Sequence, residues 1–143
     1  MKFAEFQAQV AEDLDRAMRE HLPSFFRRLK EELAPNLETR GGFAALEREM
    51  AQSTDQVVYR IMSEWVLRTA DRTPEICPAC DHALEKVTRG VEREVVLKTG
   101  KVMVRRAVGW CRGCEKWRCP GDVALMLNEV TGHDEAGDVG LRA

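Results

Sequence analysis

Two Cys-x-x-Cys pairs are the residues of this chain whose type and spacing point to chemistry. One pair is Cys77 and Cys80, and the other is Cys111 and Cys114. Four thiolates brought together provide the soft tetrahedral donor set of structural zinc sites, with no position left for a substrate. Either pair could instead be reduced cytosolic thiols or a redox motif, but a redox motif needs only one pair. The doubled spacing therefore predicts one structural Zn²⁺ ion bound by Cys77, Cys80, Cys111 and Cys114.

A fifth cysteine and a histidine lie close to these pairs in the sequence. Cys119 follows Cys114 by five residues and is predicted to be a small buried hydrophobic residue, with a role as a substitute ligand as the alternative. His82 follows Cys80 by two residues and could replace a ligand of the first pair. No Ser/His/Asp arrangement, phosphate-binding glycine loop or paired carboxylate motif stands out. We therefore expect no enzymatic activity and no small-molecule substrate.

The segment between the two cysteine pairs has the periodicity of β-strands. Apolar and polar residues alternate over residues 91–98, Thr99-Gly100 predicts a turn, and residues 101–108 predict the returning strand. The order of knuckle, hairpin and knuckle predicts a zinc ribbon over residues 74–122. Residues 123–143 are expected to form one or two helical turns and then a disordered acidic tail.

Residues 1–73 carry apolar side chains at helical spacing and predict an N-terminal helical unit of three to four helices. Pro23-Ser24 is expected to end the first helix, with Ser24 as the N-cap of the second. Residues 53–56 could divide the next helical region or lie inside one long helix. The unit would be a small bundle, or an arm whose apolar stripe is completed by a second copy. The predicted fold class is α+β, a helical unit followed by a small zinc-ribbon hairpin module.

The composition is that of an ordinary soluble protein with an uneven distribution of charge. The 143 residues are 44% hydrophobic and 32% charged, with a net charge of -2. No stretch approaches the roughly 18–20 apolar residues of a membrane span. The N-terminus lacks a secretory pattern, so we expect a cytoplasmic protein with reduced cysteines. Residues 81–120 hold ten Lys/Arg against five Asp/Glu, whereas both flanking segments are acidic.

This basic segment predicts weak, salt-sensitive binding to DNA. Arg105 and Arg106 point to opposite faces of one strand, so one could contact phosphate while the other forms an ion pair within the ribbon. Trp117 is the expected base-stacking residue, whereas Trp110 is expected to pack in the ribbon core. The candidate DNA contacts are Lys98, Lys101, Arg105, Arg106, Arg112, Lys116 and Arg118.

Residues 75–127 resemble the N-terminal region of ISKra-type insertion-sequence transposases. The resemblance rests on the two knuckles, the turn at Thr99-Gly100, the pair Arg105-Arg106 and the sequence Pro120-Gly121-Asp122, in that order. Members of that family combine a helical segment, a zinc-ribbon hairpin and a Pro-x-Asp motif, and then continue into an RNase H-like catalytic domain. Only 21 residues follow Asp122 here, too few for such a domain. The resemblance therefore implies a truncated or stand-alone transposase N-terminal region without catalytic activity.

Two other classes of function are compatible with the same residues. The chain could be a protein-interaction adaptor or regulatory subunit, with the ribbon as a docking module and the helices for dimerisation. It could also be a subunit of an enzyme whose chemistry lies on a partner chain. DNA, a second copy of the chain or another protein are accordingly the expected partners.

Overall fold

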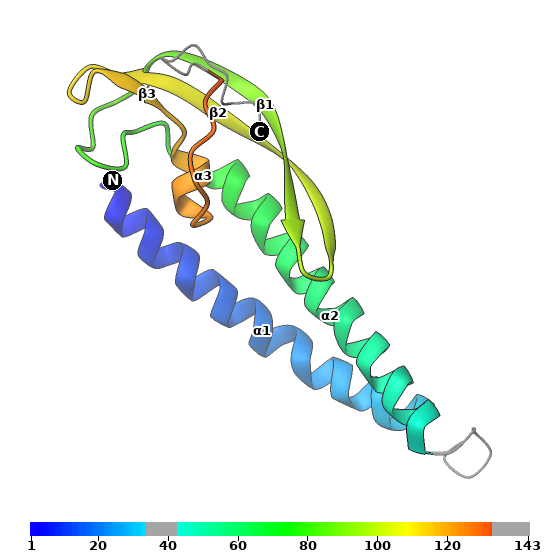
Figure 1. The fold of residues 1–143 in the computed structure, drawn as a ribbon. Helices are drawn as coiled ribbons and strands as arrows, with labels where there is room; N and C mark the ends of the chain where they lie inside the picture. The colour runs from blue at the N-terminus through cyan, green and yellow to red at the C-terminus, as the bar shows by residue number, and fades with distance from the viewer. Residues whose placement is uncertain (34–42, 133–143) are drawn as a thin grey trace.

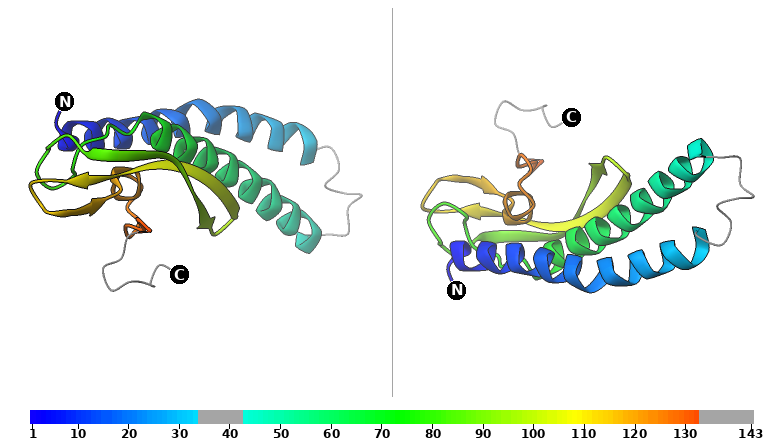
Figure 2. Two further views of the ribbon diagram at one scale, coloured as in Figure 1. Left: turned by 90° about the horizontal axis from the view of Figure 1, so that it is seen from above. Right: turned by 90° about the horizontal axis from the view of Figure 1, so that it is seen from below.

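A computed structural model describes residues 1–33 and 43–132. Two long helices, α1 (Phe3–Leu33) and α2 (Phe43–Arg72), run antiparallel, and a three-stranded antiparallel sheet lies over one end of the pair (Figures 1 and 2). The sheet has the order β1-β2-β3. Its strands and the short helix that follows are β1 (Glu85–Leu97), β2 (Gly100–Cys111), β3 (Lys116–Arg118) and α3 (Pro120–Ala124). The predicted α+β class is confirmed. None of the described helices is long and apolar enough to span a membrane.

The predicted break at Pro23 is wrong, because α1 continues through this residue. Proline has no N–H to donate to the carbonyl four residues earlier, so a proline in the interior of a helix removes one backbone hydrogen bond and is locally unfavourable. Phe25, in the next turn, is buried against Val57 and Ile61 of α2. Such packing provides most of the stability of helices in proteins and outweighs the local cost.

The second helix is continuous through residues 53–56, so the long-helix alternative is the one observed. The helical part therefore consists of two long helices instead of three to four. The loop expected around Gly41-Gly42 lies outside the described residues.

The predicted β-hairpin is present, and it is longer than the sequence indicated. Val95 pairs with Val102, and Leu97 pairs with Gly100 across the two-residue turn. β1 begins at Glu85 and contains two register shifts before Val91. Such irregularities bend and twist a strand, which accounts for the weak alternation in that part of the sequence. The short strand β3 was not predicted.

One hydrophobic core joins segments from the whole described chain. Trp65 of α2 is buried in it, and its Nε1–H donates to the carbonyl of Val10 in α1 at 3.0 Å. The buried members come from α1, α2, the sheet and the region of α3, namely Phe3, Phe6, Val10, Trp65, Val66, Val95, Val102, Val104, Ala124 and Leu125. The predicted parts 1–73, 74–122 and 123–143 therefore all contribute to one core.

The segment after the second knuckle differs from the expectation in detail. Helix α3 begins at Pro120, and no helix is assigned over the described residues 125–132. Residues 133–143, where the acidic tail was expected, lie outside the described residues.

Candidate metal centre

Two turns of similar construction present the four cysteines. Cys77 and Cys80 lie in the loop before β1, where the N–H of Asp81 donates to the carbonyl of Cys77 at 2.9 Å. Cys111 ends β2, and Cys114 lies in the turn to β3. In each turn the residue after the second cysteine has a positive φ, 64° at Asp81 and 54° at Glu115. The two knuckles thus reverse the chain in the same way and point their sulfur atoms at each other.

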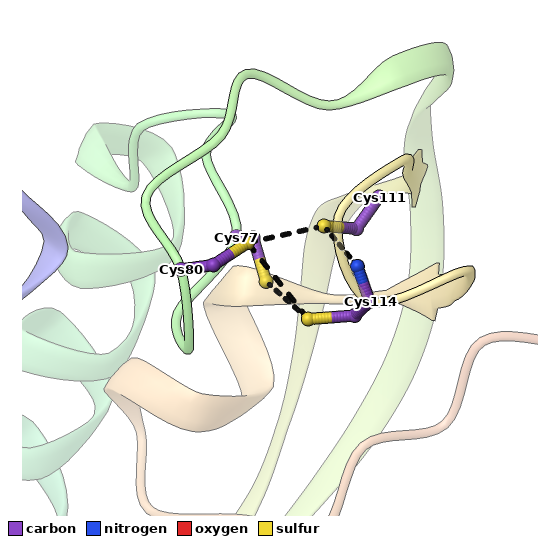
Figure 3. Close-up of side chains that lie close together, drawn as sticks. All are labelled: Cys77, Cys80, Cys111 and Cys114. Carbon is purple, nitrogen blue, oxygen red and sulfur yellow. Dashed lines mark hydrogen bonds between the residues drawn. The ribbon is translucent and has the colours of Figure 1, made fainter.

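The four sulfur atoms form one compact group. All lie within 4.8 Å of one another, and no other described His, Cys, Asp or Glu belongs to this cluster. The Sγ–Sγ distances are 3.7 Å for Cys77–Cys114, 3.3 Å for Cys80–Cys111 and 3.8 Å for Cys80–Cys114 (Figure 3). Tetrahedral zinc with Zn–S bonds of about 2.3 Å requires S–S distances of about 3.8 Å. The four cysteines are therefore positioned to hold one metal ion.

The protonation of the thiols shows why this group suits a cation. Burial opposes ionisation of Cys111, but hydrogen bonds from the backbone N–H of Cys114 and from the other thiols lower its pKa to about 7. A hydrogen bond from the backbone of His82 favours the thiolate form of Cys80. Burial and the three other thiols nevertheless raise the pKa of Cys80 to about 12. Ionisation of one thiol thus makes ionisation of its neighbours less favourable. Four thiolates at these distances need a bound cation.

The two neighbouring residues lie outside the four-sulfur group. Cys119 is fully buried, as predicted, and its sulfur accepts a hydrogen bond from Arg106 Nη1 at 3.2 Å. Burial is the main reason that the pKa of Cys119 rises to about 11. His82 is exposed, and its Nδ1 lies 3.0 Å from the sulfur of Cys80. The contact makes His82 a hydrogen-bonding neighbour of a potential ligand.

The structure divides the seven candidate DNA contacts into two groups. Five are exposed: Lys98, Lys101, Arg105, Arg112 and Lys116. Arg106 and Arg118 are buried, and their guanidinium groups pair with Asp122 at 2.6 Å and Glu129 at 2.9 Å. These two arginines cannot reach a phosphate on the surface, so their inclusion among the DNA contacts was wrong. The expectation that Arg105 and Arg106 face opposite sides is confirmed.

Arg106 and Asp122 form the centre of a buried polar network. Oδ2 of Asp122 accepts hydrogen bonds from Arg106 Nη1 at 2.6 Å and from the backbone N–H of Val130 at 2.9 Å. It also lies 3.1 Å from Arg93 Nη1. Asp122 lies in the first turn of α3, whose N-cap is Cys119. The Arg-Arg and Pro-x-Asp sequences thus meet as a structural ion pair.

The sequence predicted an ion pair within the ribbon for one of Arg105 and Arg106, but it did not identify which arginine or its partner, although a signal for the arginine was present. Arg106 alternates with Val104 and Val108, both of which face the core. Alternation alone therefore placed the arginine on the buried face of β2. The partners Asn128 and Glu129 had no comparable signal, because they lie in an irregular segment. There Arg93 donates to the carbonyl of Asn128 at 2.7 Å, and Glu129 accepts from the N–H of Cys119 at 2.8 Å.

The two tryptophans near the second knuckle form a cross-strand pair. Trp110 is opposite Trp117 in the β2–β3 register, with ring centroids 5.5 Å apart and an interplanar angle of 72°. Both side chains are half-buried. Each ring therefore shields part of the other, so the two tryptophans are not divided into one core residue and one surface residue. Base stacking by Trp117 stays a prediction.

No known protein-family model, curated protein or solved structure matches this chain. The fold and the four-cysteine cluster define an α+β protein with a zinc-ribbon-like module built on a β-hairpin. The likeness to transposases rests on the motif residues, without support from a matching family.

Proposed function

We propose that this chain is a non-catalytic zinc-binding protein in which one Zn²⁺ ion joins the loop before β1 to the β2–β3 turn. The observation that carries the proposal is the mutual approach of four cysteine sulfur atoms within 4.8 Å. Thiolate donors in a tetrahedral arrangement favour zinc over harder cations. Four protein ligands leave no position for water or substrate, so the ion would have a structural role.

The contacts around the cluster indicate what the ion would stabilise. Cys77 and Cys111 are fully buried beside Leu84, but this hydrophobic group is small. Asp81, in the first knuckle, accepts a hydrogen bond from the backbone N–H of Phe3 at 2.8 Å. Zinc would therefore hold the sheet in shape and also fix the position at which α1 begins.

We further propose that the partner is duplex DNA, bound through the exposed cations of the hairpin and the second knuckle. Three of them already have acidic neighbours: Lys101 lies 3.7 Å from Glu94, Arg105 lies 3.7 Å from Glu92, and Arg112 lies 3.0 Å from Glu85. DNA would have to compete with these pairs. Three to four phosphate contacts would give a slope of log affinity against log salt of about -3 to -4, with a Kd on the order of micromolar.

A protein-interaction adaptor is the second candidate, because the part of the helical pair remote from the sheet exposes large apolar side chains. Phe26 is 60% exposed and Phe43 is 78% exposed, and Met50 and Val58 are also exposed. Apolar groups of this kind mark contact sites when they are contiguous. A second copy of the chain or a different protein could cover them.

Two measurements on protein purified without added metal test the proposal. Elemental analysis should give about one zinc per chain. Zinc-loaded protein should then be titrated into a fluorescent DNA duplex at two salt concentrations. We expect binding that weakens steeply as salt rises. Zinc-loaded protein that fails to bind at low salt, and that sediments as a dimer, would favour the adaptor function.

A further inference from the structure

The tip of the β1–β2 hairpin rests on the middle of α2. The hydroxyl of Tyr59 donates to the carbonyl of Lys101 at 2.8 Å. Gly100 lies so close to the Tyr59 ring that a Cβ atom added there would be 2.6 Å from a ring carbon. Lys98 and Lys101 are exposed on either side of the glycine. The contact therefore holds the hairpin turn, which includes Lys98 and lies just before Lys101 in the sequence, beside α2.

Arg60, the next residue after Tyr59, connects this tip with α1. It lines a surface cavity of about 440 Å³ together with Thr99 of the hairpin turn. It also lines a cavity of about 220 Å³ together with Arg28 of α1. Arg60 thus lies on a path from the hairpin turn, with Lys98 in it and Lys101 close after it in the sequence, to Arg28 of α1.

Within residues 1–33 and 43–132, the two arginines on this path have no counterion. Both are exposed, and neither guanidinium group makes an ion pair or hydrogen bond with a described residue. The cavity between them has no carboxylate among its described lining residues, and it includes Ser24 and His21 as further polar groups. Nearby acidic residues include Asp55, beside the hairpin turn, Glu64, 3.5 Å from His21, and Glu94, 3.7 Å from Lys101. Glu31 lies one helical turn after Arg28 in α1.

We propose that Lys98, Lys101, Arg60 and Arg28 form a phosphate-binding surface for duplex DNA, here called the tip–arm surface. This inference rests on the proposed DNA-binding function. It assigns the strongest phosphate contacts to the tip–arm surface instead of the second knuckle. A guanidinium group without a protein partner can bind a phosphate through two hydrogen bonds and loses no ion pair in doing so. An anion between Arg28 and Arg60 also relieves their mutual repulsion.

The second knuckle is a weaker candidate for binding phosphate, because its cations have acidic residues beside them. Arg112 is already paired with Glu85 at 3.0 Å, and Glu115 lies between Arg112 and Lys116 in the sequence. The eleven residue-to-residue steps from Lys101 to Arg112 correspond to about 36 Å of extended strand. The knuckle and the hairpin tip are thus separate surfaces, and their contributions to binding can be measured separately.

The experiment compares three doubly substituted variants of the zinc-loaded full chain. Arg28→Ala with Arg60→Ala removes the two arginines of the tip–arm surface, and Arg112→Ala with Lys116→Ala removes the cations of the knuckle. The matched control is Arg16→Ala with Arg19→Ala, because it removes the same charge from two exposed residues of α1 that pair with Asp13 and Asp15. Circular dichroism melting checks that each variant is folded. Binding of a fluorescent duplex is measured over a range of salt concentrations.

We expect the Arg28/Arg60 variant to lose tens-fold in affinity at about 0.1 M salt, because each phosphate contact contributes about 0.9 log units there. Its salt slope should flatten by about two, whereas the control should change little. If the variant binds like the control while the knuckle variant is impaired, the tip–arm assignment is wrong and DNA binding stands. If the unsubstituted protein binds no duplex at low salt, the proposed DNA-binding function fails as well. Equal binding of inorganic phosphate by all variants would also contradict a phosphate contact at these arginines.

Discussion

The two ends of the helical pair both carry apolar residues at helical spacing but have different surroundings. At the end that carries the sheet, α1 and α2 pack against each other and against β1 and β2, and Trp65 is 6% exposed. At the other end, the described residues of the cluster around Phe25, Val57 and Ile61 all come from the two helices. Phe26 is 60% exposed there. The spacing of apolar residues makes both ends helical, but the sheet, which covers only one end, decides which of these residues are buried.

The largest expected effect is the loss of the metal. Cys77→Ser or Cys111→Ser should abolish stoichiometric zinc binding, because each removes a buried sulfur from the cluster. Structural zinc contributes about 10–16 kcal/mol of apparent binding free energy in small folds, so we expect the knuckles to unfold. Cys119→Ser is the matched control and should retain the zinc. Elemental analysis of the three variants checks this, and loss of metal from the control would move Cys119 into the ligand set.

Chelation tests whether the end that carries the sheet depends on the ribbon. We expect the strand signal in circular dichroism to disappear while most of the helical signal remains at low temperature. The helices should melt at a lower temperature, because β1 and β2 no longer cover Trp65 and Val66. A helical signal that survives chelation would support the prediction that residues 1–73 fold independently of the metal. A helical signal lost together with the zinc would show that the two parts fold as one unit.

The buried ion pair should give the next largest effect. Arg106→Ala leaves the carboxylate of Asp122 buried without its closest partner and should cost about 3–5 kcal/mol of unfolding free energy. Replacing both residues, Arg106→Met with Asp122→Leu, should cost much less, since no buried carboxylate is then left unpaired and Arg93, which also lies beside Asp122, still donates to the carbonyl of Asn128. Arg105→Ala, on the exposed face, is the control. Thermal or urea unfolding measures all three, and a costly Arg105→Ala would contradict the different placement of the two arginines.

Core substitutions compare the two ends directly. Trp65→Ala should destabilise the protein by about 3–5 kcal/mol, because the ring fills the shared core and donates to Val10. Phe25→Ala should cost about 2 kcal/mol, because the surrounding surface is open and can close over the gap. Hydrogen exchange should show that Phe25→Ala loosens only the helix turns remote from the sheet. Equal costs at the two positions would remove the distinction between the ends.

The smallest effect concerns Pro23. Pro23→Ala restores a backbone N–H inside α1 and should stabilise the helix by about 1–2 kcal/mol, less than the full cost of an interior proline. The gain should appear as slower amide exchange over residues 24–30. Ser24→Ala is the neighbouring control and should have little effect. A destabilised Pro23→Ala variant would mean that the proline is required by the local geometry.

Local patterns in the sequence determined the pairing of the cysteines as two knuckles, the hairpin and the helical character of residues 1–73. The hairpin turn was predicted at Thr99-Gly100 and lies one residue earlier, at Lys98-Thr99, since Gly100 is the first residue of β2. These features depend on side-chain spacing and on turn residues, so they can be predicted without knowledge of the fold. Pro23 was a local signal that failed, because burial of Phe25 against α2 outweighed it. The buried position of Arg106 was accessible from strand alternation, but the charge of the residue suggested the surface.

Only the tertiary structure showed that the core is shared and that Arg106 reaches Asp122. It also placed the hairpin tip on Tyr59 and set Arg60 beside Arg28, residues that lie 32 positions apart in the sequence. These relations depend on how the twisted sheet lies across the helical pair. No periodicity encodes that placement, because it is selected by the sum of many contacts between segments distant in the chain.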